Sequence, residues 1–215
     1  MSTQRQPYVL GARWAGPMYG PNLGAPPIVE KVVATANTLG VFRGDFAQEL
    51  TTGDVYPCTR GGGSYPSLSF VILSVTRYYA SDGQMKRGSF VPAQTAYTGG
   101  ISLTNPLASV VLCIPVAGQL FQLTVPTAES TAAAAAGKVG KCIDINPGAG
   151  SVVTGLSGHL AYTGTDATYG WQSTTVAGQL RLESIPKYGL NGTLNDPTVA
   201  NWTGIFSVVE TIVTV

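Results

Sequence analysis

His159 is the only histidine in the chain, so any Ser-His-Asp or Cys-His catalytic machinery would have to use it. It stands in the segment Ser157-Gly-His-Leu-Ala161, which is typical of a strand that follows a turn. No nucleophile-elbow pattern lies nearby in the sequence. We therefore expect a structural or surface histidine, and we predict that the protein is not an enzyme.

The carboxylates number eleven, and nothing in their spacing selects a pair for acid–base catalysis. A glycosidase needs only two carboxylates across a cleft, so counting alone does not exclude that class. Asp82 and Asp196 stand in the turn sequences Ser-Asp-Gly and Asn-Asp-Pro, where aspartate caps backbone groups. One histidine and scattered acids also provide no ligand cluster for a metal. We predict no catalytic residue, no metal site and no cofactor.

The cysteines, Cys58, Cys113 and Cys142, are odd in number, far apart and never in a C-x-x-C pair. This pattern argues against both a disulfide framework and a zinc site. Cys113 lies in the apolar run Val110-Val-Leu-Cys-Ile114, where a cysteine behaves as a small buried hydrophobic residue. We expect no redox or nucleophilic role for any of the three.

Charged side chains are scarce, because the 215 residues include only 12 Lys and Arg and 11 Asp and Glu. The charged fraction is 11%, against about 25% in an ordinary soluble domain. With a formal net charge of +1, the surface provides little repulsion between copies, which favours a protein that sits against other protein. The balanced charge argues against nucleic acid as the main partner, because binding phosphates needs clustered Lys and Arg.

The sequence shows neither a membrane span nor a secretory leader. No apolar run reaches the roughly 20 residues that cross a bilayer. The first residues, Met1-Ser-Thr-Gln-Arg-Gln-Pro7, lack the apolar core of a signal peptide. We expect no membrane partner, and synthesis in a cytoplasm.

Residues 1–28 form the first unit of the chain. Gly or Pro recurs every few positions between Pro7 and Pro27, which excludes a helix and any central strand. The same stretch is too aromatic for a plain disordered linker. We interpret residues 1–28 as an extended N-terminal arm that orders by docking on a neighbouring protein. An irregular segment packed across its own domain is the alternative.

Residues 29–215 have the pattern of a β-rich domain, with short strands separated by Gly and Pro turns. Two hairpins are predicted, 68–79 with 85–91 and 109–115 with 119–125. We therefore predict a mainly β fold, an antiparallel sandwich or barrel with one short helix and the extended N-terminal arm.

The helix is expected over residues 128–136, an alanine-rich run that Thr127 can cap and Gly137 can end. A flexible low-complexity loop is the alternative. Residues 29–215 are interpreted as one domain, with a division into two lobes, 29–100 and 101–215, left open. Further strands are predicted at 141–145, 158–162, 179–185 and 205–215.

The second half of the chain has a distinctive order of features from about Ala117 onward. They are a strand ending in Phe121-Gln-Leu-Thr-Val125, the alanine-rich segment 127–137, Gly140-Lys-Cys-Ile-Asp-Ile145, Gln179-Leu-Arg-Leu-Glu-Ser-Ile185, the loop Asn195-Asp-Pro197, and Asn201-Trp202 before a closing strand. This order resembles the head-associated structural proteins of tailed bacteriophages, the small decoration or cement proteins that bind outside an icosahedral capsid. Residues 29–100 would be additional β structure.

The resemblance implies a virion structural protein on the capsid exterior, made in the host cytoplasm, that staples neighbouring capsid subunits together. Its partners would be the major capsid protein and copies of itself, as a dimer or trimer. In this interpretation the arm lies in a groove of a capsid subunit or a sister copy, and deleting residues up to Pro27 leaves the β domain folded. The residues expected to bind the partner are Arg5, Tyr8, Arg13, Trp14, Met18 and Tyr19.

A receptor- or glycan-binding module of a head fibre or tail is the alternative function. Aromatic side chains exposed in loops could stack on sugars. The other interpretation of these residues is ordinary packing in the core and in turns. The aromatic residues concerned are Tyr169, Trp171, Tyr188 and Trp202.

Overall fold

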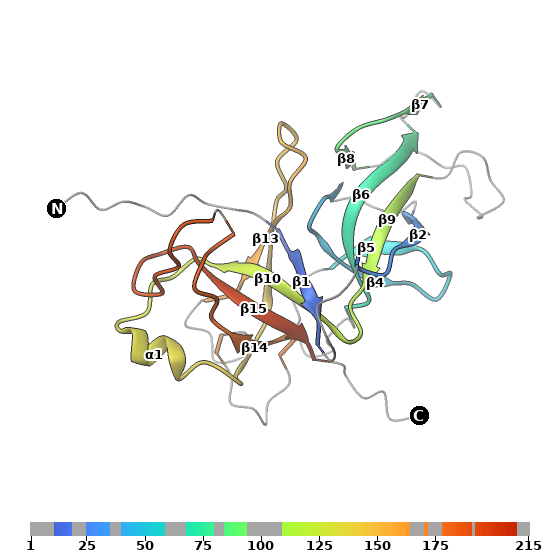
Figure 1. Ribbon diagram of the computed structural model, residues 1–215. Coiled ribbons are helices and arrows are strands. Elements are labelled where there is room, and N and C mark those ends of the chain that lie inside the picture. The colour runs from blue at the N-terminus through green and yellow to red at the C-terminus, as the bar shows by residue number, and fades with distance from the viewer. Residues whose placement is uncertain are drawn as a thin grey trace.

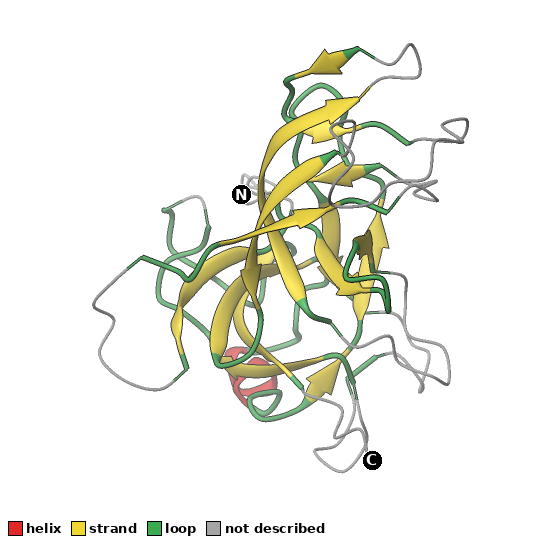
Figure 2. Cartoon of the chain, turned by 90° about the vertical axis from the view of Figure 1, so that its right-hand side faces the viewer, coloured by secondary structure: helices red, strands yellow, loops and turns green. Residues whose placement is uncertain are grey.

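The computed structural model describes residues 11–18, 25–34, 40–58, 68–79, 84–93, 109–163, 170–171, 178–190 and 192–209. This part of the chain is mainly β, with several antiparallel sheets and one short helix, which confirms the predicted fold class. In Figure 2 the strands of the sheets are yellow, and the short helix is red at the lower end of the molecule.

The larger sheet is antiparallel and curls back on itself. Its strands in spatial order are β2 (Val29–Val32), β9 (Val110–Pro115), β6 (Phe70–Tyr79), β4 (Phe46–Glu49) and β5 (Val55–Pro57), with β7 (Met85–Lys86) beside the end of β6. Val33, just after β2, forms a parallel bridge with Val55 of β5. Ala34 N also donates to Val55 O at 2.9 Å. The first and last strands therefore meet, so that the sheet encloses a core of its own.

The inside of this curled sheet is filled by side chains that alternate along its strands. Phe70 and Ile72 of β6 pack there with Val111 and Cys113 of β9, and all four are buried. The spacing of two follows from strand geometry, because successive side chains point to opposite faces. The residues between them face the rest of the molecule.

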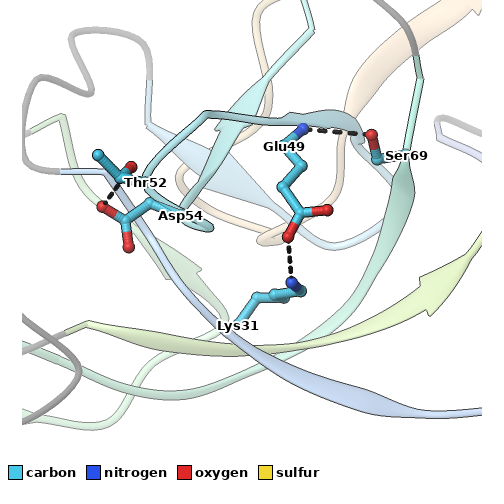
Figure 3. Close-up of polar contacts among 5 residues, drawn as sticks. All are labelled: Lys31, Glu49, Thr52, Asp54 and Ser69. Atoms are coloured by element: carbon cyan, nitrogen blue, oxygen red, sulfur yellow. Dashed lines mark hydrogen bonds and ion pairs between the residues drawn. The ribbon is translucent and has the colours of Figure 1, made fainter.

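An ion pair lies at one end of this enclosed core. Lys31 of β2 forms a salt bridge with Glu49 of β4, although the two strands are not neighbours in the sheet order (Figure 3). Lys31 Nζ lies 4.9 Å from the centre of the Phe70 ring. Glu49 N donates to Ser69 Oγ at 3.3 Å. Since both charged groups reach solvent, we expect the pair to contribute about 1 kcal/mol or less to stability.

The second sheet contains five antiparallel strands, and two short strand pairs complete the fold, one beside β10 of this sheet and one beside β6 of the first. In Figure 1 its strands β10 and β15 cross the body between β1 and β14. Its strands in spatial order are β1 (Arg13–Pro17), β10 (Gln119–Val125), β15 (Trp202–Val208), β14 (Leu180–Ser184) and β11 (Cys142–Ile143). The additional pairs are β12 (Ile145–Gly148) with β13 (Gly158–Ala161), and β3 (Val41–Phe42) with β8 (Phe90–Val91).

A shared hydrophobic core joins the two sheets. Phe46, Val71 and Ile114 of the first sheet belong to the same buried cluster as Phe121 and Phe206 of the second. The rings of Phe46 and Phe121 meet edge to face, with their centres 5.8 Å apart. Burial of a large apolar side chain contributes about 1.5–3 kcal/mol. Each sheet therefore stabilises the other, and the two form one structural unit.

The chain passes from the first sheet to the second at the turn 116–118, where the sequence predicts a hairpin. β9 pairs with β2 and β6, whereas β10 pairs with β1 and β15, so the predicted pairing of 109–115 with 119–125 is wrong. Val116 N donates to Ser69 O at 3.0 Å, which keeps this end of the chain in the first sheet. β9 therefore belongs to the first sheet, and the chain enters the second sheet after residue 117. The other predicted hairpin is confirmed where β6 pairs with β7.

The helix is shorter than predicted. α1 spans Ala132–Ala136, and its cap is Thr131, whose hydroxyl accepts a main-chain N–H at 3.0 Å. Thr127, the expected cap, lies outside the helix, because Glu129 N donates to a carbonyl of the loop before β15. Gly137 follows the helix as predicted, so the sequence located its end but placed its start too early.

The described part of the expected N-terminal arm is a strand of the domain itself. β1 pairs with β10, and the attachment continues at both ends: Gly11 N donates to His159 O at 3.3 Å, and Met18 N donates to Gly118 O at 2.8 Å. For residues 11–18 the structure therefore replaces the free arm by an edge strand. Its place at an edge agrees with the exclusion of a helix and of a central strand. Residues 1–10 and 19–24 lie outside the described residues.

Candidate functional site

The residues that the sequence assigns to partner binding are only partly within the described chain. Arg13 and Trp14 belong to β1, and Met18 follows it, half-buried. The other three predicted residues, Arg5, Tyr8 and Tyr19, lie outside the described residues.

Trp14 is used inside the domain. Its Nε1 donates to Gln119 Oε1 at 2.8 Å, and its half-buried ring packs against the shared core. The indole N–H and much of the ring surface of Trp14 are thus already used within its own chain, which leaves little of the side chain to contact another protein. Trp14 therefore stabilises its own domain, while its predicted role as an anchor on a partner stays a prediction.

Arg13, by contrast, is exposed and reaches a neighbouring loop. Its Nη1 donates to Leu190 O at 3.0 Å. This loop folds back on itself, with Tyr188 and Leu194 in an antiparallel bridge. Gly189 N donates to Thr193 O at 2.9 Å within the same turn. The loop and the edge strand thus present their side chains together.

Asn195 fixes this loop to β15. Its buried amide accepts Thr203 N–H at 2.8 Å and donates to Thr203 O at 2.8 Å, as a neighbouring strand would. The same amide nitrogen lies 2.8 Å from Pro186 O. A loop held in one conformation loses less entropy when it binds a partner.

We call the group formed by the exposed residues Arg13, Lys187, Tyr188 and Leu194 and the half-buried Leu190 the Arg13 surface. Tyr188 and Leu194 are 56% and 64% exposed, and Lys187 Nζ lies 5.6 Å from the centre of the Tyr188 ring. Arginine and tyrosine are the residue types that dominate protein-binding hot spots. The sequence pointed to Arg13 for partner binding and to Tyr188 for sugar stacking. It did not point to Lys187, Leu190 or Leu194, although the apolar residues around the glycine turn could have indicated this surface.

A second exposed apolar point lies at the turn between β12 and β13, which projects from the body in Figure 1. Val152 and Val153 are 64% and 89% exposed. The turn is internally bonded, with Gly155 N donating to Ser151 O at 2.7 Å and Ser151 N to Leu156 O at 2.9 Å. We call these two valines the Val152–Val153 tip. The sequence analysis did not point to this tip, although two adjacent valines in an uncharged loop could have indicated it.

His159 lies in a buried polar junction that joins the two sheets. Its Nδ1 accepts Phe46 N–H at 3.1 Å, and its Nε2 lies 3.5 Å from Asp45 Oδ1. Asp45 Oδ2 accepts Phe42 N–H at 2.8 Å, and Ser157 Oγ accepts His159 N–H at 2.9 Å. Because Nδ1 is an acceptor, the imidazole proton is assigned to Nε2, facing Asp45. Both ring nitrogens are thus occupied within the fold, which suits the structural histidine that the sequence predicts.

Burial controls the ionisation of this junction. It lowers the pKa of His159, because an imidazolium ion would lose its hydration, and the nearby Asp45 carboxylate opposes this effect. Burial also raises the pKa of Asp45, against the effects of His159, Ser157 and the Phe42 N–H. A neutral imidazole agrees with the geometry, since Phe46 N–H needs an unprotonated Nδ1.

The aromatic residues proposed for sugar stacking do not form one platform. Trp202 is fully buried, and its Nε1 donates to Thr127 O at 3.0 Å. Trp171 packs against the shared core with Lys138 over its ring. Tyr169 lies outside the described residues. Tyr188 is left as the exposed ring of this set within the described chain.

All three cysteines are buried and none forms a disulfide; the burial of Cys113 agrees with the small hydrophobic residue that the sequence predicts there. Burial raises the pKa of Cys58 and of Cys113 to about 12, so neither is an activated thiolate. Within the described ranges, no three His, Cys, Asp or Glu side chains come together as metal ligands. In the same residues, no helix has the length and apolar character needed to cross a membrane.

Comparison of the chain with protein-family models, with curated proteins and with solved structures finds no match. The resemblance to bacteriophage decoration proteins therefore stays a prediction. A functional proposal has to be built on the residues of this chain.

Proposed function

We propose that this chain is a structural protein of virus particles that binds the outer capsid surface and staples neighbouring capsid subunits. The observation that carries the proposal is the scarcity of charge, 23 side chains in 215 residues, on a fold that also exposes apolar residues. Such a surface repels other protein weakly and gains free energy when it is covered. The order of features from Ala117 onward supports the same class.

The contacts would be made by the Arg13 surface and the Val152–Val153 tip. They lie on separate loops of the molecule, so a single copy can touch two neighbours at once. Repeated weak attachment of this kind gains strength beyond any single contact, because the second contact forms at high effective concentration. The partners in this proposal are the major capsid protein and further copies of the chain, with neither nucleic acid nor membrane involved.

The first test is the composition of purified virus particles. The proposal expects the protein in many copies per particle, and it expects particles that lack it to break at lower temperature. A double variant, Tyr188→Ser with Leu194→Ser, should fold normally and lower the occupancy of capsids. The matched control is Val139→Ser, which removes another exposed apolar side chain, 45% exposed, outside both contact sites. Equal occupancy of the double variant and the control would reject the Arg13 surface as the contact.

A receptor- or glycan-binding module is the second candidate, and the exposed ring of Tyr188 is the observation that favours it. The two functions differ in copy number and in the effect of loss. A receptor-binding module should be scarce in the particle, and its loss should stop adsorption without lowering heat resistance. Normal adsorption by particles that lack the protein would reject this second function.

A further inference from the structure

A cavity of about 210 Å³ lies beside the buried polar junction. Asp45 and His159 line it, although only 2% and 3% of their surfaces are exposed. Its apolar wall includes Phe42 and Pro147, and Ala149, which is exposed, stands at its border. The cavity has room for about seven water molecules, each taking roughly 30 Å³.

When Asp45 is ionised, no described cation balances its charge, and burial accordingly raises the pKa of its carboxyl. The groups that Asp45 contacts, the Phe42 N–H, the Ser157 hydroxyl and the imidazole of His159, are all neutral donors. The imidazole stays neutral because its Nδ1 accepts Phe46 N–H. No described Lys or Arg forms an ion pair with Asp45. An ionised Asp45 is therefore a buried negative charge held by hydrogen bonds alone, in surroundings where Coulomb attraction is much stronger than in water.

The shape and chemistry of the cavity restrict what could balance this charge. A metal ion would need several charged ligands, and the described chain brings no three such side chains together. An organic cation needs one carboxylate for its head and apolar contact for its stem. The Phe42 ring and Pro147 supply that contact, and an aromatic ring also attracts a cation.

We propose that this cavity is a binding site for a small organic cation, with a guanidinium or primary ammonium head paired to Asp45 and its apolar stem against Phe42 and Pro147. The site is independent of the Arg13 surface and of the virion proposal. It lies between the β12–β13 pair and the residues around β3 and β5, so an occupant would also bridge these parts of the fold.

The experiment uses the fact that the chain contains one histidine. Because burial raises the pKa of Asp45, the full-length protein is titrated at about pH 8, far above the ordinary carboxyl pKa of about 4, while the His159 ring resonances are followed by NMR. Methylguanidinium and methylammonium are the probes, and N-methylurea is the uncharged control of the same shape as methylguanidinium. The proposal expects a saturable shift with at least one cation and none with N-methylurea. No saturable shift with either cation, or an equal response to N-methylurea, would overturn it.

Two variants locate the site. Asp45→Asn removes the charge and should weaken cation binding at least about tenfold, or about 1.4 kcal/mol. Because Asp45→Asn also alters the junction and can impair folding, Ala149→Phe provides the second measurement. This substitution at an exposed position keeps Asp45 and blocks the cavity, so it too should abolish the His159 shift in a folded protein. Undiminished binding to a folded Ala149→Phe variant would refute the assignment.

Discussion

Gly11→Ala tests whether the N-terminal segment is built into the domain. Gly11 has φ +83°, and a Cβ added there would lie 2.8 Å from Ser157 Cβ and 3.2 Å from Gly44 Cα. The left-handed backbone costs an alanine about 1–2 kcal/mol, and forcing an atom into packed surroundings costs about 1–3 kcal/mol more. The expected loss of stability is therefore about 2–5 kcal/mol. Denaturant unfolding followed by tryptophan fluorescence measures it, since Trp202 is fully buried.

Gly53→Ala is the matched control for this prediction. Gly53 has φ +84°, nearly the same backbone, but nothing lies within 4 Å of an added Cβ. The Gly53→Ala variant should therefore lose only the stability that the left-handed backbone costs an alanine, about 1–2 kcal/mol. The difference between the two variants then measures the contact of Gly11 with its neighbours. If Gly11→Ala were no more destabilising than Gly53→Ala, residues 11–12 would not be held between Ser157 and Gly44. The N-terminal segment would then be interpreted again as an arm that is not packed into the domain.

Truncation, pH and thiol labelling test three other parts of the structure. Deleting residues 1–27 removes β1 and the packing of Trp14, so thermal unfolding should show that the free energy of unfolding falls by at least about 2 kcal/mol. The control is a chain that lacks only residues 1–10 and so keeps β1. Equal stability of the two shortened chains would contradict this. Because burial lowers the pKa of His159, its contribution to stability is complete above about pH 6.5 and declines as the pH falls, by at most about 1.4 kcal/mol per pH unit. His159→Gln, which cannot be protonated there and leaves Asp45 in place, should unfold with a smaller pH dependence over that range, and an unchanged dependence would exclude His159 as its source. Finally, the thiols of Cys58 and Cys113 should react with a thiol reagent such as DTNB only on unfolding, since both are buried with a pKa of about 12; rapid labelling of the native protein would contradict this.

The sequence predicted local features well. The alternation of Leu180 and Leu182 with polar neighbours indicated a half-buried strand, and both leucines are buried in β14. Gly137 follows α1 as predicted, and the described residues 11–18 form no helix, since glycine and proline weaken a helix at their own positions. For His159 the sequence predicted a structural or surface residue, without its buried contacts to Phe46 and Asp45.

Contacts between distant residues could not be predicted. Trp14 meets Gln119, 105 positions away, and Phe46 N–H meets His159, 113 positions away. Turn signals such as Val-Ala-Gly reverse the chain equally well between two paired strands and between two sheets, so the predicted hairpin at 109–125 was a reasonable but wrong choice. The Arg13 surface combines an edge strand with a loop whose Leu190 lies 177 positions further along the chain. Only the sheet order brings these two segments together.

The edges of the sheets matter for a protein with so little charge. Exposed strand edges are the usual starting points of aggregation, and charged side chains are the usual protection. Here the larger sheet has its outer strands joined by the Val33–Val55 bridge. In the second sheet, one edge strand has an irregular register near Gly16 and ends in Pro17, while the other, Cys142–Ile143, is two residues long. In these described strands, backbone geometry thus limits edge-to-edge pairing with other chains, a role that ionised side chains have elsewhere.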